Sequence, residues 1–246
     1  MKLSNVITSA QDRTTKLTNQ FRTTDIGVFG IDISRIDSDV TFRWLVAAVL
    51  LGSGLPRRQA VTQYRALEQA GLTTPERISA AGLRGIYTAL QGDAVWDTTR
   101  FASVLVAVAS VLIIRYEGDL NRLHFFAEGA QDLERRLLSL SSRLPLTAVH
   151  IFLRGLRGIW EKAEPPFTPA ARMAYTALFS CYYQDYESPG DLERHLEEGY
   201  FGDVTPYAFE AALEQLGERY CQRHRCAACP FRGDCTMNRT TERRDE

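Results

Sequence analysis

Four cysteines lie close together near the C-terminus of the sequence, in the pattern Cys221-x4-Cys226-x2-Cys229-x5-Cys235. Thiolates are soft ligands that bind zinc or iron–sulfur clusters, and both kinds of site commonly take four of them. Zinc sites usually present two tight pairs separated by a long spacer. Because only one tight pair is present here, we expect a [4Fe–4S] cluster, with zinc as the alternative. A fifth cysteine, Cys181, lies in an apolar, aromatic stretch and is interpreted as a core residue.

The basic residues are almost all arginine. Lysine occurs only at Lys2, Lys16 and Lys162, within a total of 29 lysines and arginines. A guanidinium group makes forked contacts with phosphate, but it cannot form a Schiff base with a sugar. The formal net charge of −1 gives no global electrostatic sign of a nucleic-acid partner, so any such binding must come from a local basic face.

Apolar stretches in the sequence are too short to predict a membrane span. The two longest, 42–51 and 101–114, fall below the ~20 residues that a helix needs to cross a bilayer, and each carries or adjoins an arginine. No signal peptide is visible, since the first 21 residues are polar in character. We therefore expect a cytoplasmic protein with no membrane partner, in which disulfides are disfavoured.

The pattern along the chain predicts an all-α fold. Residues 1–24 are polar without an apolar period and are expected to form a loose arm, and 26–36 is expected to lie extended. Asp37 offers N-cap chemistry, and no stretch alternates as a strand would. Helices are expected at 40–51, 57–69, from 74–75 onward, and at 93–116, 120–126, 129–140, 145–156, 169–186, 190–198 and 206–220.

The last three cysteines and the order of the helices resemble the endonuclease III branch of the helix-hairpin-helix DNA glycosylases. Members of that family end in a C-x6-C-x2-C-x5-C iron–sulfur loop, and here the first gap is shorter by two residues. The segment 42–51 resembles the family's early buried helix, and Leu144-Pro145 with the helix after it resembles the second half of the hairpin. The resemblance implies two helical domains, a monomer, and double-stranded DNA, damaged in particular, as the partner. It therefore also implies a nucleoid-associated location in the cytoplasm. It also implies an N-terminal arm (1–36) on the cluster domain, a six-helix barrel-type domain (37–148), a cluster domain carrying the second hairpin helix (149–236) and a flexible tail (237–246).

The functional positions of that family are altered in this sequence. The family's hairpin reads LPGVGxKTA, and here Leu146 and Ala148 replace its two glycines. The Schiff-base lysine falls on His150, the catalytic aspartate falls near Thr168, and the polar residue inserted into the vacated base stack falls near Gly54. Glycosidic cleavage relies on a carboxylate and lyase chemistry on an amine of lowered pKa, so lysine-based lyase activity is not expected. Lys162, flanked by two glutamates, is a displaced candidate, with a solvated charged turn as the alternative.

Arginines near the hairpin, the glycine turn and the cysteine loop are the candidate DNA contacts. Guanidinium contacts to phosphates would position DNA without reading its sequence. The candidates are Arg57, Arg58, Arg143, Arg154, Arg157, Arg223, Arg225 and Arg232.

Three functions are therefore compatible with the sequence. The first is a DNA-binding base-excision-repair protein resembling endonuclease III, acting as a monofunctional DNA glycosylase. The second is a catalytically inactive protein that binds damaged or structured DNA. The third is an iron–sulfur redox protein, in which the cluster itself would be the function.

Overall fold

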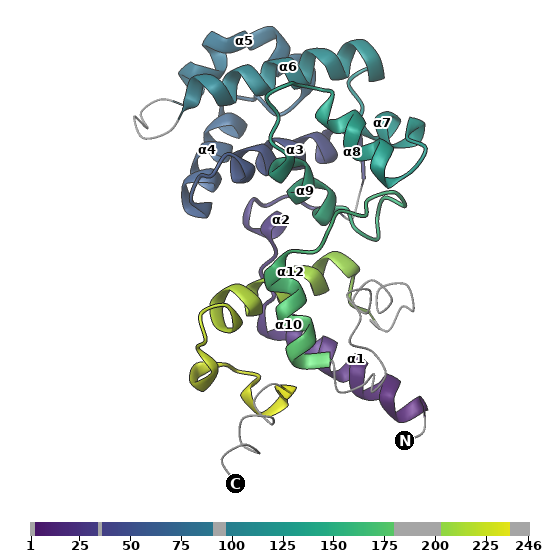
Figure 1. Ribbon diagram of the computed structural model, residues 1–246. Coiled ribbons are helices and arrows are strands. Elements are labelled where there is room, and N and C mark those ends of the chain that lie inside the picture. The colour runs from purple at the N-terminus through teal and green to yellow at the C-terminus, as the bar shows by residue number, and fades with distance from the viewer. Residues whose placement is uncertain (1–2, 34–35, 91–96, 180–202, 237–246) are drawn as a thin grey trace. The chain divides into compact units, whose positions relative to one another are not determined.

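The computed structural model describes residues 3–33, 36–90, 97–179 and 203–236, and every regular element within these ranges is a helix (Figure 1). No strand occurs in the described residues, which confirms the all-α prediction for that part of the chain. The expected helix at 190–198, Cys181 and the tail 237–246 lie outside the described residues.

The chain divides into two compact units. One combines Met1–Thr24 with Pro166–Glu246, and the other is Asp25–Pro165. The predicted domain limits differ from this division in two ways. The predicted limit at 148/149 falls inside helix α9 (Leu146–Gly155). Residues 25–36, which were expected in the N-terminal arm, belong to the Asp25–Pro165 unit.

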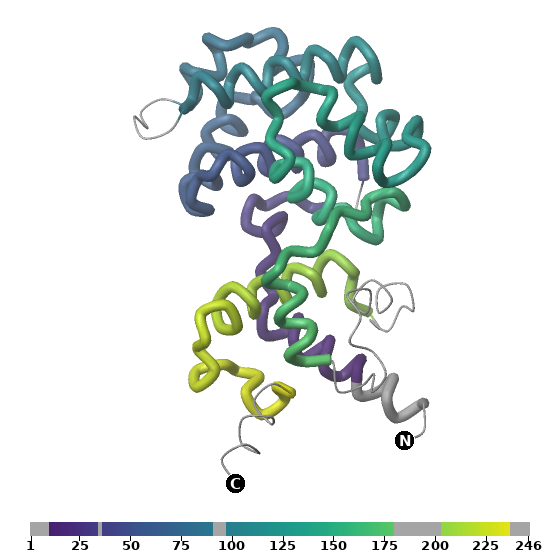
Figure 2. Tube along the Cα trace, in the orientation of Figure 1, coloured from purple at the N-terminus to yellow at the C-terminus, as the bar shows by residue number. Residues whose placement is uncertain are grey.

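The Asp25–Pro165 unit is built around α3 (Ser38–Gly52), whose residues from Trp44 to Leu50 are all buried. The indole Nε1 of Trp44 donates a hydrogen bond to the carbonyl of Phe152 at 2.9 Å, which joins α3 to α9. Helices α5 and α6 pack along each other, as the tube trace shows (Figure 2). The other helices of this unit are α2 (Asp25–Val28), α4 (Arg57–Gln69), α5 (Pro75–Ala89), α6 (Thr98–Tyr116), α7 (Leu120–Phe126) and α8 (Ala130–Leu138).

Short polar side chains start several of these helices. The carboxylate of Asp37 accepts the Val40 amide at 2.8 Å, as its sequence position predicted, and Asp97 accepts the Arg100 amide at 2.9 Å. Such caps satisfy amide groups that have no partner within the first turn. Helix α6 ends with Glu117 in the left-handed region at φ 57°, just before Gly118.

Two predictions for the N-terminal region are wrong. Residues Leu3–Gln20 form the helix α1 instead of a loose arm, and the expected extended segment begins with α2. The first error has a clear physical cause. The buried face of α1 is small and partly polar, with Ala10, Thr14 and Leu17 buried, so the sequence shows little apolar period.

The other unit packs α1 with α10 (Pro169–Phe179) and α12 (Pro206–Leu216). Three short helical turns follow α12: η2 (Gly217–Cys221), η3 (Cys226–Ala228) and η4 (Arg232–Asp234). A shared apolar core includes Phe21, Phe179, Phe209 and Phe231. Because residues from both ends of this unit's sequence fill one core, α1 is an integral part of it.

Within the described residues, α6 is the one helix long and apolar enough to meet the criteria for a membrane span. Several of its apolar side chains, including Leu105, Val108 and Leu112, are fully buried in their own unit. A central helix of a globular core has the same composition.

Candidate functional site

The four predicted ligand cysteines sit on three successive helical turns at the end of the α1/α10/α12 unit. Cys221 ends η2, Cys226 begins η3, Cys229 follows η3 and Cys235 follows η4. The Cys229 amide donates to the Cys226 carbonyl at 3.2 Å, and the intervening His224 has a left-handed φ of 52°. All four cysteines are free thiols, and the described structure contains no disulfide among them.

The four thiols also influence one another electrostatically. Burial, followed by the nearby Cys229, Cys235 and Cys226, raises the pKa of Cys221 to about 11. Burial likewise raises the pKa of Cys229, an effect opposed by a hydrogen bond from the backbone amide of Phe231. Mutual repulsion of thiolates is what a bound cation relieves, since a coordinating metal deprotonates thiols outright.

Helix α1 supports this cysteine loop from its own unit. The Lys16 ammonium lies 2.5 Å from the Asp234 carboxylate and 5.5 Å from the centre of the Phe231 ring. The Phe21 ring stacks on Phe231 with centroids 6.3 Å apart. Phe231 lies between Cys229 and Cys235 in sequence, so Lys16 of α1 and Phe21 just after α1 contact the last part of the loop.

The donor set fits an iron–sulfur cluster. It provides four thiols, one amide that hydrogen-bonds a sulfur, and an apolar side formed where Cys221 and Cys229 pack against the core. In the described parts of the chain, no three His, Cys, Asp or Glu side chains are grouped as a single metal ion would need. If a [4Fe–4S] cluster binds, Cys221, Cys226, Cys229 and Cys235 would hold it.

Helices α8 and α9, with the turn between them, occupy the place of the predicted hairpin. The Pro145 carbonyl accepts the Ala148 amide at 3.0 Å, which starts α9. His150 projects toward α8, where its Nε2 lies 2.9 Å from the Glu134 carboxylate. Sequence reasoning did not identify Glu134, because its contact with His150 depends on how the two helices pack.

Lys162 and Thr168, the other two catalytic candidates, both make helix-end contacts. The Lys162 ammonium donates to the carbonyls of His124 and Phe125 at 3.1 and 3.3 Å, at the C-terminal end of α7. Burial lowers the pKa of His124, and the nearby Lys162 ammonium lowers it as well. The Thr168 hydroxyl accepts the Ala171 amide at 3.2 Å at the start of α10. Lys162 therefore lies in a turn beside the exposed Glu161, as the alternative interpretation held, and its ammonium caps the end of α7.

The candidate DNA-contacting arginines differ in their availability. Arg157 is only 8% exposed and donates to the Pro165 carbonyl, so the prediction of a surface phosphate contact is wrong for it. Arg57 pairs with Asp25 at 2.7 Å, and Arg154 also has partners. The remaining candidates are exposed and form no side-chain ion pair within the described residues; they are Arg58, Arg143, Arg223, Arg225 and Arg232.

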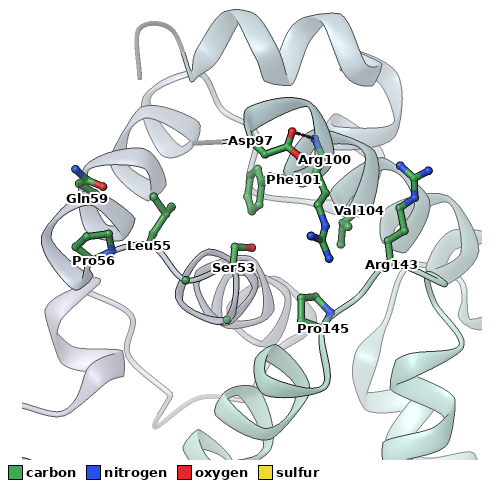
Figure 3. Close-up of a pocket in the computed structure, with 12 residues that line it drawn as sticks. Ser53, Leu55, Pro56, Gln59, Asp97, Arg100, Phe101, Val104, Arg143 and Pro145 are labelled. Atoms are coloured by element: carbon green, nitrogen blue, oxygen red, sulfur yellow. Dashed lines mark hydrogen bonds between the residues drawn. The ribbon is translucent and has the colours of Figure 1, made fainter. Parts of the chain in front are cut away.

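A pocket of about 510 Å³ lies on the Asp25–Pro165 unit (Figure 3). Its walls come from the turn after α3, the start of α4, the start of α6, and Arg143 and Pro145 between α8 and α9. The pocket places Arg100 near Arg143, although more than forty residues separate them in sequence. Sequence reasoning missed Arg100, although its position three residues after Asp97 at a helix start marks it as a surface residue.

Comparisons with known proteins do not assign this chain to a family. No protein-family model matches the sequence, and no curated protein matches it closely enough to be a relative. The functional interpretation below therefore depends on the residues themselves and on the resemblance described above.

Proposed function

We propose that this protein binds DNA on a scaffold of the endonuclease III type and holds a [4Fe–4S] cluster in its C-terminal loop. In this proposal it has two helical domains, acts on damaged double-stranded DNA as a monomer, and lacks lysine-based lyase activity. The observation that carries the proposal is the gathering of four free thiols on consecutive turns, within electrostatic range of one another, beside three unpaired arginines.

The distribution of charge supports DNA as the partner. Arg223, Arg225 and Arg232 lie between or beside the cluster ligands and are exposed without an ion-pairing partner in the described structure. A cluster held against the core would make the loop rigid, and a rigid loop presents these guanidinium groups to phosphates at low entropic cost. A local basic face of this kind is compatible with a net charge of −1.

The chemistry available near the hairpin is that of a monofunctional enzyme or of a binding protein. His150 cannot form the imine that a lysine would form, but an imidazole beside the Glu134 carboxylate can accept a proton from a water molecule. The pair would then act as a general base for base excision. The second candidate, a catalytically inactive DNA-damage or DNA-structure binding protein, is favoured by the helix-capping contacts of Lys162 and Thr168, which leave neither side chain as an evident catalyst.

The experiment that tests the proposal combines cluster content, DNA binding and base release. After anaerobic reconstitution, we expect about four iron and four sulfide per chain, with content lost in Cys226→Ser and kept in the matched control Cys181→Ser. Affinity for a DNA duplex should fall steeply with salt. Single-turnover incubation with duplexes carrying different lesions then separates an enzyme from a binding protein.

Four outcomes would contradict parts of this proposal. Stoichiometric zinc without iron would replace the cluster, and absence of salt-dependent DNA binding would remove both DNA functions. A reversible redox transition without DNA binding would support the third function, an iron–sulfur redox protein. Loss of base release in both His150→Ala and Glu134→Gln would support the pair as a base, whereas release of a base unaffected by either variant would exclude it.

A further inference from the structure

Helices α5 and α6 pack along each other at one edge of the Asp25–Pro165 unit, and both leave apolar side chains exposed (Figure 1). Leu83 and Tyr87 of α5 are 51% and 58% exposed, and Ile114 of α6 is 80% exposed. Only 39% of the most apolar stretch of α6 is buried. Because soluble proteins rarely leave a large apolar surface exposed, such a surface usually marks an interaction site.

The exposed side chains of each helix lie on one face of it. Gly82, with φ 58° and ψ −167°, interrupts α5, and Leu83 and Tyr87 follow it one helical turn apart. Side chains four positions apart in a helix are neighbours on its surface. On α6, partly exposed residues recur every three or four positions from Ser103 to Ile114. Each helix therefore carries one continuous stripe that its own unit does not cover.

The two helices run antiparallel, so that their exposed stripes adjoin. A Cβ atom at Gly118, just after α6, would lie 2.5 Å from the carboxylate of Glu76 in the first turn of α5. The end of α6 is therefore beside the start of α5. Both helices turn their other side to the core, where Ile78, Ile86 and Leu112 are fully buried. The exposed stripes consequently point to the same side and form one apolar face.

Arginines flank this apolar face. Helices α5 and α6 carry two arginines each and a single glutamate, Glu76. Arg84 and Arg115 are exposed and form no ion pair within the described residues. Glu117, the carboxylate that follows α6, pairs with Arg122 instead. The face therefore combines exposed apolar side chains with positive charge that its own helices do not compensate.

This combination of side chains suits an acidic protein helix better than it suits DNA. A DNA backbone offers phosphates, but it offers no apolar surface that Leu83, Tyr87 and Ile114 could cover. An amphipathic helix lays its apolar face on such a surface and contacts it at positions i, i+3, i+4 and i+7. Carboxylates along the flanks of that helix would pair with Arg84 and Arg115, and complementary charges of this kind select the partner and its orientation.

We propose that the apolar face of α5 and α6, with Arg84 and Arg115 at its flanks, docks an acidic amphipathic helix of a partner protein. Leu83, Tyr87 and Ile114 supply the apolar contacts, and the two arginines distinguish an acidic helix from a basic one. The inference goes beyond the proposed DNA binding and does not depend on it, because none of the candidate DNA-contacting arginines lies on α5 or α6.

The test uses two synthetic helical peptides of about 20 residues as probes. Both carry leucine along one face, and the flanks of that face are glutamate in one peptide and lysine in the other. Wild-type protein should bind the glutamate peptide about tenfold more tightly, because two or three exposed ion pairs together change an affinity by about this factor. Leu83→Ser/Ile114→Ser should weaken binding of the glutamate peptide about tenfold. The matched control is Phe125→Ser, which changes an exposed aromatic residue on α7.

A second variant tests the charge separately. Arg84→Glu/Arg115→Glu keeps the apolar side chains and should reverse the preference, so that the lysine peptide binds more tightly. Wild-type protein that binds neither peptide, or an unchanged preference in the charge variant, would overturn the proposal.

Two further outcomes would overturn the partner helix in favour of another occupant. Dimerisation that is lost in Leu83→Ser/Ile114→Ser, without binding of either peptide, would assign the face to a second copy of the chain. Binding to vesicles of anionic lipid alone would assign it to a membrane surface. DNA binding by the same wild-type sample reports on the proposed function, so the docking face and the proposed function can fail separately.

Discussion

Gly217 is the position where the packing of the cysteine-bearing unit can be tested most directly. It lies at the start of η2, which ends at Cys221, and a Cβ atom there would lie 2.1 Å from the Ala170 carbonyl oxygen and 2.5 Å from its carbon. These are backbone atoms of α10, so they cannot rotate away. Gly217→Ala must push η2 and α10 apart, and with them the first cysteine ligand.

The size of the effect follows from two opposing contributions. Gly217 has ordinary helical angles, so alanine gains about 1 kcal/mol in helix propensity. Overpacking against well-packed atoms typically costs about 1–3 kcal/mol and occasionally more. Because the contact is with backbone at far less than van der Waals distance, we take the upper end and expect a net loss of about 2 kcal/mol. With an m value of about 2 kcal/mol/M, the urea midpoint should fall by about 1 M.

Gly233 in the same loop supplies the matched control, because an added Cβ there meets no atom within 4 Å. Gly233→Ala should unfold within about 0.5 kcal/mol of wild type, as exposed substitutions usually do. Urea unfolding followed by circular dichroism measures both variants, and iron content after reconstitution should be reduced only in Gly217→Ala. If Gly217→Ala proves as stable as Gly233→Ala and retains full iron, the close packing of η2 on α10 is refuted.

The other predictions concern α1, α7 and α8. Phe21→Ala should destabilise the protein by about 3 kcal/mol in urea unfolding, because a buried aromatic ring packed on Phe231 is lost; an unchanged midpoint would mean that α1 does not pack on the cysteine loop. Lys162→Met should lower the free energy of unfolding by about 1 kcal/mol, because the hydrogen bonds to the end of α7 are lost, and DNA affinity should stay unchanged. Reduced DNA affinity at wild-type stability would indicate a DNA contact instead. The hydrogen bond from Arg136, then the Glu128 amide, lowers the pKa of Asp132 to about 2, below the ordinary value of about 3.9. The stabilising contribution of the Asp132 carboxylate is therefore complete above pH ~4 and is lost as the pH falls through ~2. The melting temperatures of wild type and Asp132→Asn should therefore converge at the acid end of that window. A constant difference between them across the window would contradict the assignment.

Most helices could be predicted from the sequence because their signals are local. The segment 40–51 is apolar enough to be central, and α3 spans it; the expected limits of 57–69 and 120–126 coincide with those of α4 and α7. Asp37 was correctly identified as an N-cap because such capping depends on residues three positions apart. Helix α1 was missed for the opposite reason, since its stability comes from Phe21, Lys16 and other contacts with residues about two hundred positions away.

The candidate sites show the same distinction. The types and spacing of Cys221, Cys226, Cys229 and Cys235 place four thiols near one another in sequence, because a short loop keeps its cysteines close whatever the rest of the fold does, and metal binding by them stays a prediction. The exposure of the arginines was not predictable in this way. Arg157 looks like Arg143 in sequence, yet it is buried because the chain returns at Pro165 to cover it.

The sequence by itself therefore determined the helical class, most helix positions and the proximity of four cysteines in one loop, all of which depend on residues that are near one another along the chain. Only the tertiary structure decided that α1 supports this loop, that His150 faces Glu134, and that Arg100 and Arg143 share a pocket above Gly52. The physical reason is that these contacts join distant segments whose relative positions are set by the packing of whole helices, which no local pattern specifies.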